Sequence, residues 1–186
     1  MQSRSILAAI TVSASIVMLS AIDINLHSMP FKVTYDSLAE PVQKQVTCLA
    51  DNIYFEAAHE PLDGKKAVAF VTINRVLTGN YASSICEVVE QKRGHTCQFS
   101  WFCDKRFTDR RLSIKDTPLY NDIRELAVNM YVNFEKYVDV TSGATYYHAD
   151  YVNPRWKLER VDQIGHHIFY RSAKDEINRS RNIYSE

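Results

Sequence analysis

Hydrophobic residues recur at helical spacing in the first half of this chain. One apolar stripe is formed by Val46, Leu49, Ile53 and Ala57. The stripe predicts an amphipathic helix over residues 43–59, because positions three and four apart share one face of a helix. We expect Pro61 and the Asp63-Gly64 turn to end it.

Three further segments show the pattern of helices. Residues 65–77 are apolar nearly all round, which predicts a helix buried in the core. Residues 84–90 form a short helical run that Ser83 or Ser84 can cap. Residues 119–138 repeat an apolar stripe after Thr117-Pro118, a start signal for a long helix.

Extended segments are fewer and come late in the chain. Residues 145–148 and 163–170 are rich in aromatic and β-branched side chains, and we expect two strands that pair as a small sheet. Asn153-Pro154 and Trp156 would lie in their connection. Residues 97–106 read as an aromatic loop that could expose Gln98, Ser100 and Trp101 to a ligand, or pack beneath the domain. The fold class is therefore α+β and mainly helical.

The first 26 residues differ from the rest of the chain. Arg4 precedes residues 6–22, a run of 17 residues without a charge, thirteen of them apolar. This is typical of a signal peptide or an uncleaved signal-anchor, and it is marginal for a spanning helix. We expect export to the periplasm or cell envelope, with a segment over residues 1–26 that could hold the protein at the membrane.

The remaining chain divides into three parts. Residues 27–42 read as a linker because they hold two prolines and scattered polar groups. Residues 43–172 carry the predicted helices and strands and form one domain. Residues 173–186 are a polar, charged tail.

Cysteine usage agrees with export. The chain has four cysteines, Cys48, Cys86, Cys97 and Cys103. An even number in an exported chain favours two disulfides, with three possible pairings. Zinc is the competing interpretation, but the spacings contain no C-x-x-C pair.

Composition excludes some partners and leaves others open. Lys+Arg and Asp+Glu are 22 each, so the formal net charge is zero, and no basic stripe appears. This argues against nucleic acid as a partner. Eleven tyrosines and eight phenylalanines suit a carbohydrate or peptide cleft.

The strongest candidate chemistry lies at the end of the first predicted helix. Glu56 and Glu60 are four residues apart and project from one face. The competing interpretation is two solvated charges on a surface helix. Glu56 follows Tyr54 and Phe55, and burial among aromatic groups would raise its pKa and suit it to donate a proton. Glu60, beside Pro61, is the better candidate for a solvated charge.

Other reaction classes are less well supported by the residues. The chain has no G-x-S-x-G motif and no glycine-rich phosphate loop. His59 beside Glu60 is a single histidine, whereas metalloprotease motifs place two on one helical face.

The chain resembles the SleB-type cell wall hydrolases, which are related to spore-cortex-lytic enzymes. The matching pieces occur in the family's order: CLADNIYFEAAHEP (48–61), GKKAVAFVTINRV (64–76), ICEVV (85–89), CQFSWFCD (97–104), TYYHA (145–149) and QIGHHIFY (163–170). The family usually reads EARGEP where this chain has EAAHEP, so Ala58 and His59 alter the lip beside the acid.

The resemblance implies a lysozyme-like domain that cleaves the peptidoglycan glycan strand. We expect a monomer without a cofactor or metal. It identifies Glu56 as the catalytic acid. It implies further substrate contacts at the family's recurring positions, Asn74, Gln98, Ser100, Tyr146, Tyr147 and His167.

Three hypotheses follow. No matching motif places a second acid, which favours lytic transglycosylase chemistry, in which one carboxyl acts first as acid and then as base. A zinc-dependent amidase that cuts between muramic acid and the stem peptide is the first alternative. A non-catalytic wall-binding domain is the second.

Overall fold

The computed structural model describes residues 32–175. The predicted signal or anchor segment, residues 1–26, lies outside the described residues, as does nearly all of the predicted tail. Within the described part, no helix has the length and apolar character needed to cross a membrane.

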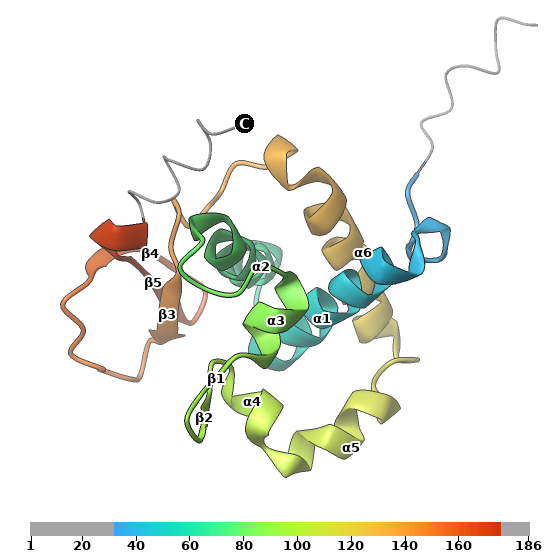
Figure 1. The fold of residues 1–186 in the computed structure, drawn as a ribbon, viewed down its shortest axis with the longest axis horizontal. Helices are drawn as coiled ribbons and strands as arrows, with labels where there is room; N and C mark the ends of the chain where they lie inside the picture. Colours follow the sequence, from blue (N-terminus) through green and yellow to red (C-terminus); the bar gives the residue numbers. More distant parts are fainter. Residues whose placement is uncertain (1–31, 176–186) are drawn as a thin grey trace, which may run out of the picture. The chain divides into compact units, whose positions relative to one another are not determined.

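Six α-helices form most of the domain (Figure 1). They are α1 (Glu40–Ala57), α2 (Leu62–Thr78), α3 (Ile85–Glu90), α4 (Ser100–Cys103), α5 (Lys105–Ser113) and α6 (Pro118–Asn133). Short 3-10 turns lie at Tyr35–Ser37 and Phe134–Lys136. Helix α1 packs against α2, α3 and α6, which makes it the centre of the helical core.

The helices form for the reasons that the hydrophobic pattern predicts. The stripe of α1 is buried, with Val46, Leu49 and Ile53 fully inaccessible. Helix α2 is buried on most of its surface and ends at Gly79, whose φ of 66° suits a left-handed C-cap. The Thr117 side chain accepts a hydrogen bond from the backbone of Tyr120 and caps α6.

Two antiparallel sheets complete the domain (Figure 1). Strands β1 (Lys92–Arg93) and β2 (Thr96–Cys97) form a small hairpin. Strands β3 (Tyr146–Ala149), β4 (Glu159–Ile164) and β5 (His167–Arg171) form a sheet of order β3-β5-β4. Tyr146 lies opposite Tyr170, so the predicted pairing of the two late segments is confirmed.

The predicted strand over residues 163–170 is wrong in one respect, because a turn divides it. Gly165 has a φ of 59°, a left-handed conformation that glycine adopts readily, and the chain reverses there. The C-terminal half of the segment pairs with β3, and the other half belongs to β4. Periodicity alone did not separate these two strands.

Several helix boundaries also differ from prediction. The last predicted helix ends at Asn133 instead of residue 138, and α4 lies within residues 97–106, which were predicted to be a loop. Helix α1 ends at Ala57, and the Asp63-Gly64 pair lies in the first turn of α2 instead of ending α1. A Cβ on Gly64 would come within 2.9 Å of the Glu60 Cβ, so the helix needs glycine there. Helix α5 was not predicted, because its sequence, KRFTDRRLS, has a weak apolar stripe.

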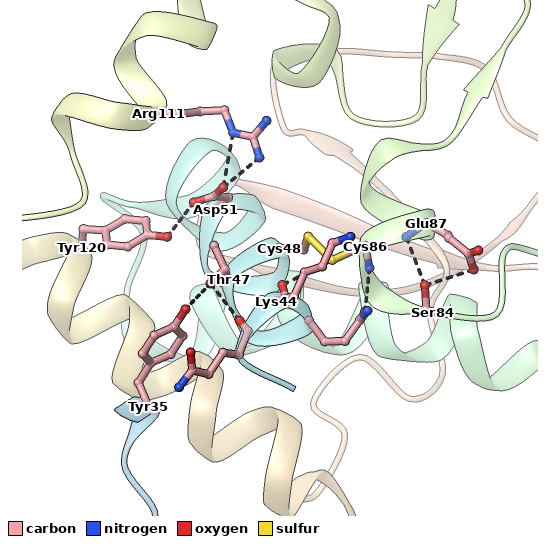
Figure 2. The surroundings of a disulfide bond; sticks show 12 residues. Tyr35, Lys44, Thr47, Cys48, Asp51, Ser84, Cys86, Glu87, Arg111 and Tyr120 are labelled. Carbon is pink, nitrogen blue, oxygen red and sulfur yellow. Dashed lines mark hydrogen bonds and ion pairs between the residues drawn. A yellow bond between two sulfur atoms is a disulfide. The ribbon is translucent and has the colours of Figure 1, made fainter. Parts of the chain in front are cut away.

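The four cysteines form two disulfides, as predicted, and the pairing is Cys48 with Cys86 and Cys97 with Cys103. The first joins α1 to α3 (Figure 2). The second closes the short segment that contains α4.

A buried carboxylate fastens α1 to two other helices. Asp51 is fully buried and accepts a hydrogen bond from the Tyr120 hydroxyl at 2.6 Å. The Arg111 guanidinium pairs with the same carboxylate at 3.0 Å (Figure 2). Because Tyr120 lies on α6 and Arg111 on α5, this cluster positions the weakly apolar α5 against the core.

Candidate active site

Glu56 lies in the last turn of α1, where the helix reaches the sheet. Its carboxylate accepts a hydrogen bond from the Tyr147 hydroxyl of β3 at 2.9 Å. Burial raises the pKa of Glu56, while the Tyr147 hydrogen bond and the Arg75 charge act in the opposite direction. The net effect favours a protonated carboxyl group, as predicted from its aromatic neighbours.

Two cavities meet at Glu56. One has a volume of about 510 Å³ and is walled by the end of α1 and by α5. The other has a volume of about 360 Å³ and is lined by Glu56, Arg75, Cys97, Gln98, Phe99, Ser100, Tyr146, Tyr147 and Trp156. We call the first the α5 cavity and the second the sheet cavity. Glu56 lines both cavities, so a chain-like ligand that occupied both would pass Glu56.

The structure brings together most of the residues that sequence reasoning placed beside Glu56. Gln98, Ser100, Tyr146 and Tyr147 line the sheet cavity with it. Gln98 and Ser100 are exposed, so their polar groups are free to meet a ligand. These residues come from two segments far apart in sequence, the α4 region and β3.

Asn74 and His167 line neither cavity. The Asn74 side chain is buried and donates hydrogen bonds to the Asp139 carboxylate at 3.0 Å and the Ala144 carbonyl at 3.1 Å. His167 packs its ring edge-on against Tyr147, with 5.1 Å between centroids. Burial lowers the pKa of His167, which favours a neutral ring. His167 therefore packs behind Tyr147, and Asn74 fastens α2 to residues 139–144.

The expectation that Trp101 could face a ligand is wrong. Its side chain is only 3% exposed, and its indole NH donates to Asn52 at 3.0 Å. Its ring stacks on Phe55, the neighbour of Glu56 in sequence. Residues 97–103 are thus a segment stapled by a disulfide, in which Phe99 and Trp101 are buried and Gln98 and Ser100 are exposed.

Glu60 was expected to be solvated, but its carboxylate accepts a hydrogen bond from the backbone NH of His166 at 3.0 Å. Sequence reasoning also missed Trp156 and the α5 side chains Phe107 and Arg110 as cavity walls. The basic residues of α5 gave no signal of a cleft. Trp156 is 40% exposed in a loop, and its only signal was an aromatic beside a proline turn.

Metal-ligating side chains do not cluster in the described part of the chain. Between residues 32 and 175, no group of three or more His, Cys, Asp or Glu side chains is placed to hold a metal ion.

Comparison with known proteins bears on this arrangement. A family model for cell wall hydrolases matches residues 59–170. The chain belongs to the cell wall hydrolase family. The match begins three residues after Glu56, and it spans α2, both sheets and the residues of the sheet cavity other than Glu56.

Individual relatives agree with the family. Two spore cortex-lytic enzymes of Bacillus cereus are each 26% identical over 130 residues, which is 68% of this chain. The chain spans 44% of the length of these relatives. The SleB-type resemblance is therefore confirmed.

Two solved structures share the fold. The catalytic domain of the germination-specific lytic transglycosylase SleB from Bacillus anthracis matches with a TM-score of 0.52, 23% identity and coverage of 69% of this chain and 95% of that chain. The catalytic domain of Bacillus cereus SleB gives a TM-score of 0.51 at 23% identity, covering 69% and 91%. The predicted fold class, mainly helical with a small sheet, is confirmed.

Proposed function

We propose that this cell wall hydrolase family member cleaves the glycan strand of peptidoglycan, with Glu56 as its proton donor. The observation that carries the proposal is the position of Glu56, a carboxyl group of raised pKa where two cavities meet. Glycosidic cleavage needs an acid that is still protonated near neutral pH, to protonate the leaving oxygen. The lytic transglycosylase of the same fold supports this assignment.

Glu56 would act in two steps. It first protonates the glycosidic oxygen, and the bond to the muramoyl carbon breaks. The resulting carboxylate keeps its hydrogen bond from Tyr147, which stabilises the charged form. It then accepts the proton of the attacking hydroxyl, which restores the acid.

A single carboxyl in both roles is supported by the cavity linings. The linings contain two acidic residues, Glu56 and Glu60. Glu60 lines only the α5 cavity and binds the His166 backbone, whereas Glu56 lines both cavities, which favours Glu56 as the acid that acts on substrate. We infer lytic transglycosylase chemistry, in which the muramoyl 6-hydroxyl attacks its own ring and proximity supplies much of the rate. Because peptidoglycan is the substrate, the protein would act outside the cytoplasm.

Mass spectrometry of products released from purified peptidoglycan tests both which bond is cleaved and whether cleavage proceeds by transglycosylation. We expect muropeptides that end in 1,6-anhydromuramic acid. Reducing-end muramic acid without the anhydro form would contradict transglycosylation and leave hydrolysis. Free stem peptides, with intact glycan, would contradict glycan cleavage altogether.

Two variants identify the acid. Glu56→Gln should fold normally and lose at least a thousandfold in turnover, because the amide cannot donate a comparable proton. Glu87→Gln is the matched control, since Glu87 is an exposed residue of α3 that lines neither cavity. Near-normal turnover by Glu56→Gln, or an equal loss in Glu87→Gln, would contradict the assignment.

A further inference from the structure

Arg75 is a buried cation held rigidly beside the Glu56 carboxyl. It lies in the last turn of α2 and is only 3% exposed. Its Nε donates to the Thr145 carbonyl at 2.8 Å. Its guanidinium carbon lies 5.0 Å from the ring centroid of Phe99 and 5.5 Å from that of Tyr81. One hydrogen bond and two aromatic faces therefore fix the plane of the guanidinium group.

One end of this group has no partner. Nη1 of Arg75 is buried and makes no hydrogen bond with any described residue. A buried donor without an acceptor is costly, and native proteins rarely leave one unsatisfied. Burial also lowers the pKa of Arg75, which reflects the cost of holding the charge there. A favourable interaction with the negative end of the α2 dipole, which a basic residue in the last turn can make, does not account for Nη1.

The position of Arg75 indicates which kind of group its guanidinium can bind. Arg75 lines the sheet cavity together with Glu56, Gln98 and Ser100. A guanidinium group only donates hydrogen bonds, so its partner must be an acceptor oxygen. In a peptidoglycan strand the strongest neutral acceptors near the scissile bond are the carbonyl oxygens of the acetamido groups and of the lactyl-peptide arm, ahead of the hydroxyl and ring oxygens.

We propose that the Arg75 guanidinium group, which keeps N–H donors without an acceptor among the described residues, binds a substrate carbonyl oxygen in the sheet cavity and so fixes the register of the sugar against Glu56. This inference rests on the proposed function. Trp156 lines the same cavity, is 40% exposed, and meets Tyr146 edge-to-face at 5.7 Å between centroids. An exposed indole face suits the apolar face of a sugar ring. Arg75 would then supply the polar, directional contact of that subsite.

Binding is measured in the Glu56→Gln protein, which separates it from turnover. Isothermal titration with soluble glycan fragments should show affinity about tenfold weaker when Arg75→Lys or Arg75→Gln is added. Lysine keeps the charge but lacks the planar guanidinium geometry, and glutamine loses the charge-assisted hydrogen bond. Arg124→Gln is the matched control, since Arg124 stacks on Tyr35 and lines neither cavity. Unchanged affinity in both Arg75 variants would overturn the proposal.

A second measurement does not depend on how well the Arg75 variants fold. In ¹⁵N-labelled Glu56→Gln protein, the Arg75 side-chain resonances should shift on titration with glycan, and those of Arg124 should not. Glycan stripped of stem peptides, and chitooligosaccharides without a lactyl arm, separate the two sources of the carbonyl. Binding that leaves the Arg75 signals unmoved with every glycan would overturn the proposal.

The proposed function can fail separately. If Glu56→Gln cleaves peptidoglycan at the wild-type rate, the assignment of Glu56 is wrong, whatever the Arg75 measurements give. In wild-type protein the Arg75→Lys substitution should raise KM more than it lowers kcat. A fall in kcat alone, with KM unchanged, would contradict a binding role for Arg75.

Discussion

Glu60 holds the turn between β4 and β5 against the end of α1, because its carboxylate accepts a hydrogen bond from the backbone NH of His166 at 3.0 Å. The residue before His166 is Gly165, and a Cβ added there would collide with the same Glu60 oxygen. Sequence position 165 is therefore glycine for two reasons, its φ of 59° and the approach of Glu60. Glu60 is four residues from Glu56 in sequence. The contact therefore fixes the β4–β5 turn to the same end of α1 that carries the proposed catalytic acid.

Replacing Gly165 by alanine should therefore cost more stability than the backbone conformation alone explains. A left-handed alanine costs about 1–2 kcal/mol, and displacement of Glu60 would add about 1–3 kcal/mol through the lost hydrogen bond. Gly94→Ala is the matched control, because Gly94 has a φ of 62° and nothing within 4 Å of an added Cβ. Urea unfolding of both variants measures the difference.

A double-mutant cycle isolates the part due to Glu60. In a Glu60→Ala background the collision is absent, so Gly165→Ala should cost about as much as Gly94→Ala. Additive effects of Gly165→Ala and Glu60→Ala would show that the contact has no energetic role.

The raised pKa of Glu56 predicts how stability depends on pH. Glu56 has a folded-state pKa above its ordinary value of 4.5, so its contribution to stability is present below that value and is lost as pH rises through the folded pKa. The glutamine in Glu56→Gln does not ionise, so no buried charge forms in that variant as pH rises. It should unfold at a higher temperature than wild type at neutral pH, and at nearly the same temperature at pH 4.

Glu87 provides a control of opposite sign. Hydrogen bonds from Ser84 and Ser83 lower the pKa of Glu87, so its contribution to stability is present above the unfolded pKa and is lost in acid. Glu87→Gln should therefore be no more stable than wild type at neutral pH. If calorimetry gave Glu56→Gln and Glu87→Gln the same pH dependence of the unfolding temperature, burial of Glu56 would not be the cause of that dependence.

Tyr147→Phe should change the pH profile of the reaction. The Tyr147 hydroxyl stabilises the ionised form of Glu56, so removing it should raise the pKa of Glu56 further. The limb of the kcat/KM profile on which the acid loses its proton should then move to higher pH, and kcat should fall about tenfold. Tyr170→Phe removes a hydroxyl that is 3.0 Å from His148 on the same sheet, and should leave that limb in place.

Helical spacing predicted most of the helical core, because α1, α2 and α6 each bury a continuous apolar surface. It failed at α5, which is held by the pair between Arg111 and Asp51. A charged residue carries no periodic signal, and its partner lies 60 positions away in sequence. Tertiary contacts of this kind determine the structure without appearing in local pattern.

In the candidate site too, local sequence predicted some features and tertiary contacts determine the others. Aromatic neighbours in sequence predicted the burial that raises the pKa of Glu56, because that burial begins with its own helix. The bond from Glu60 to the His166 backbone spans 106 positions, and nothing local indicates it. The open donor of Arg75 depends on Phe99, Tyr81 and Thr145 around it. No single segment of sequence contains that arrangement.

The two disulfides should contribute unequally to stability. The pair Cys48–Cys86 encloses a separation of 38 residues and Cys97–Cys103 one of 6. In the chain-entropy model these loops correspond to about 4 and about 2 kcal/mol. Urea unfolding of the paired alanine variants should give that order, with both transitions compared under non-reducing conditions.

The shorter bridge should matter more for substrate than its energy suggests. Cys97 lies in the wall of the sheet cavity, next to Gln98, whereas neither Cys48 nor Cys86 lines that cavity. Removing Cys97–Cys103 should therefore raise KM severalfold in the folded protein, and removing Cys48–Cys86 should lower the unfolding temperature while KM stays near its wild-type value. If instead the loss of Cys48–Cys86 raised KM and the loss of Cys97–Cys103 left KM unchanged, the stapled segment would not shape the cavity.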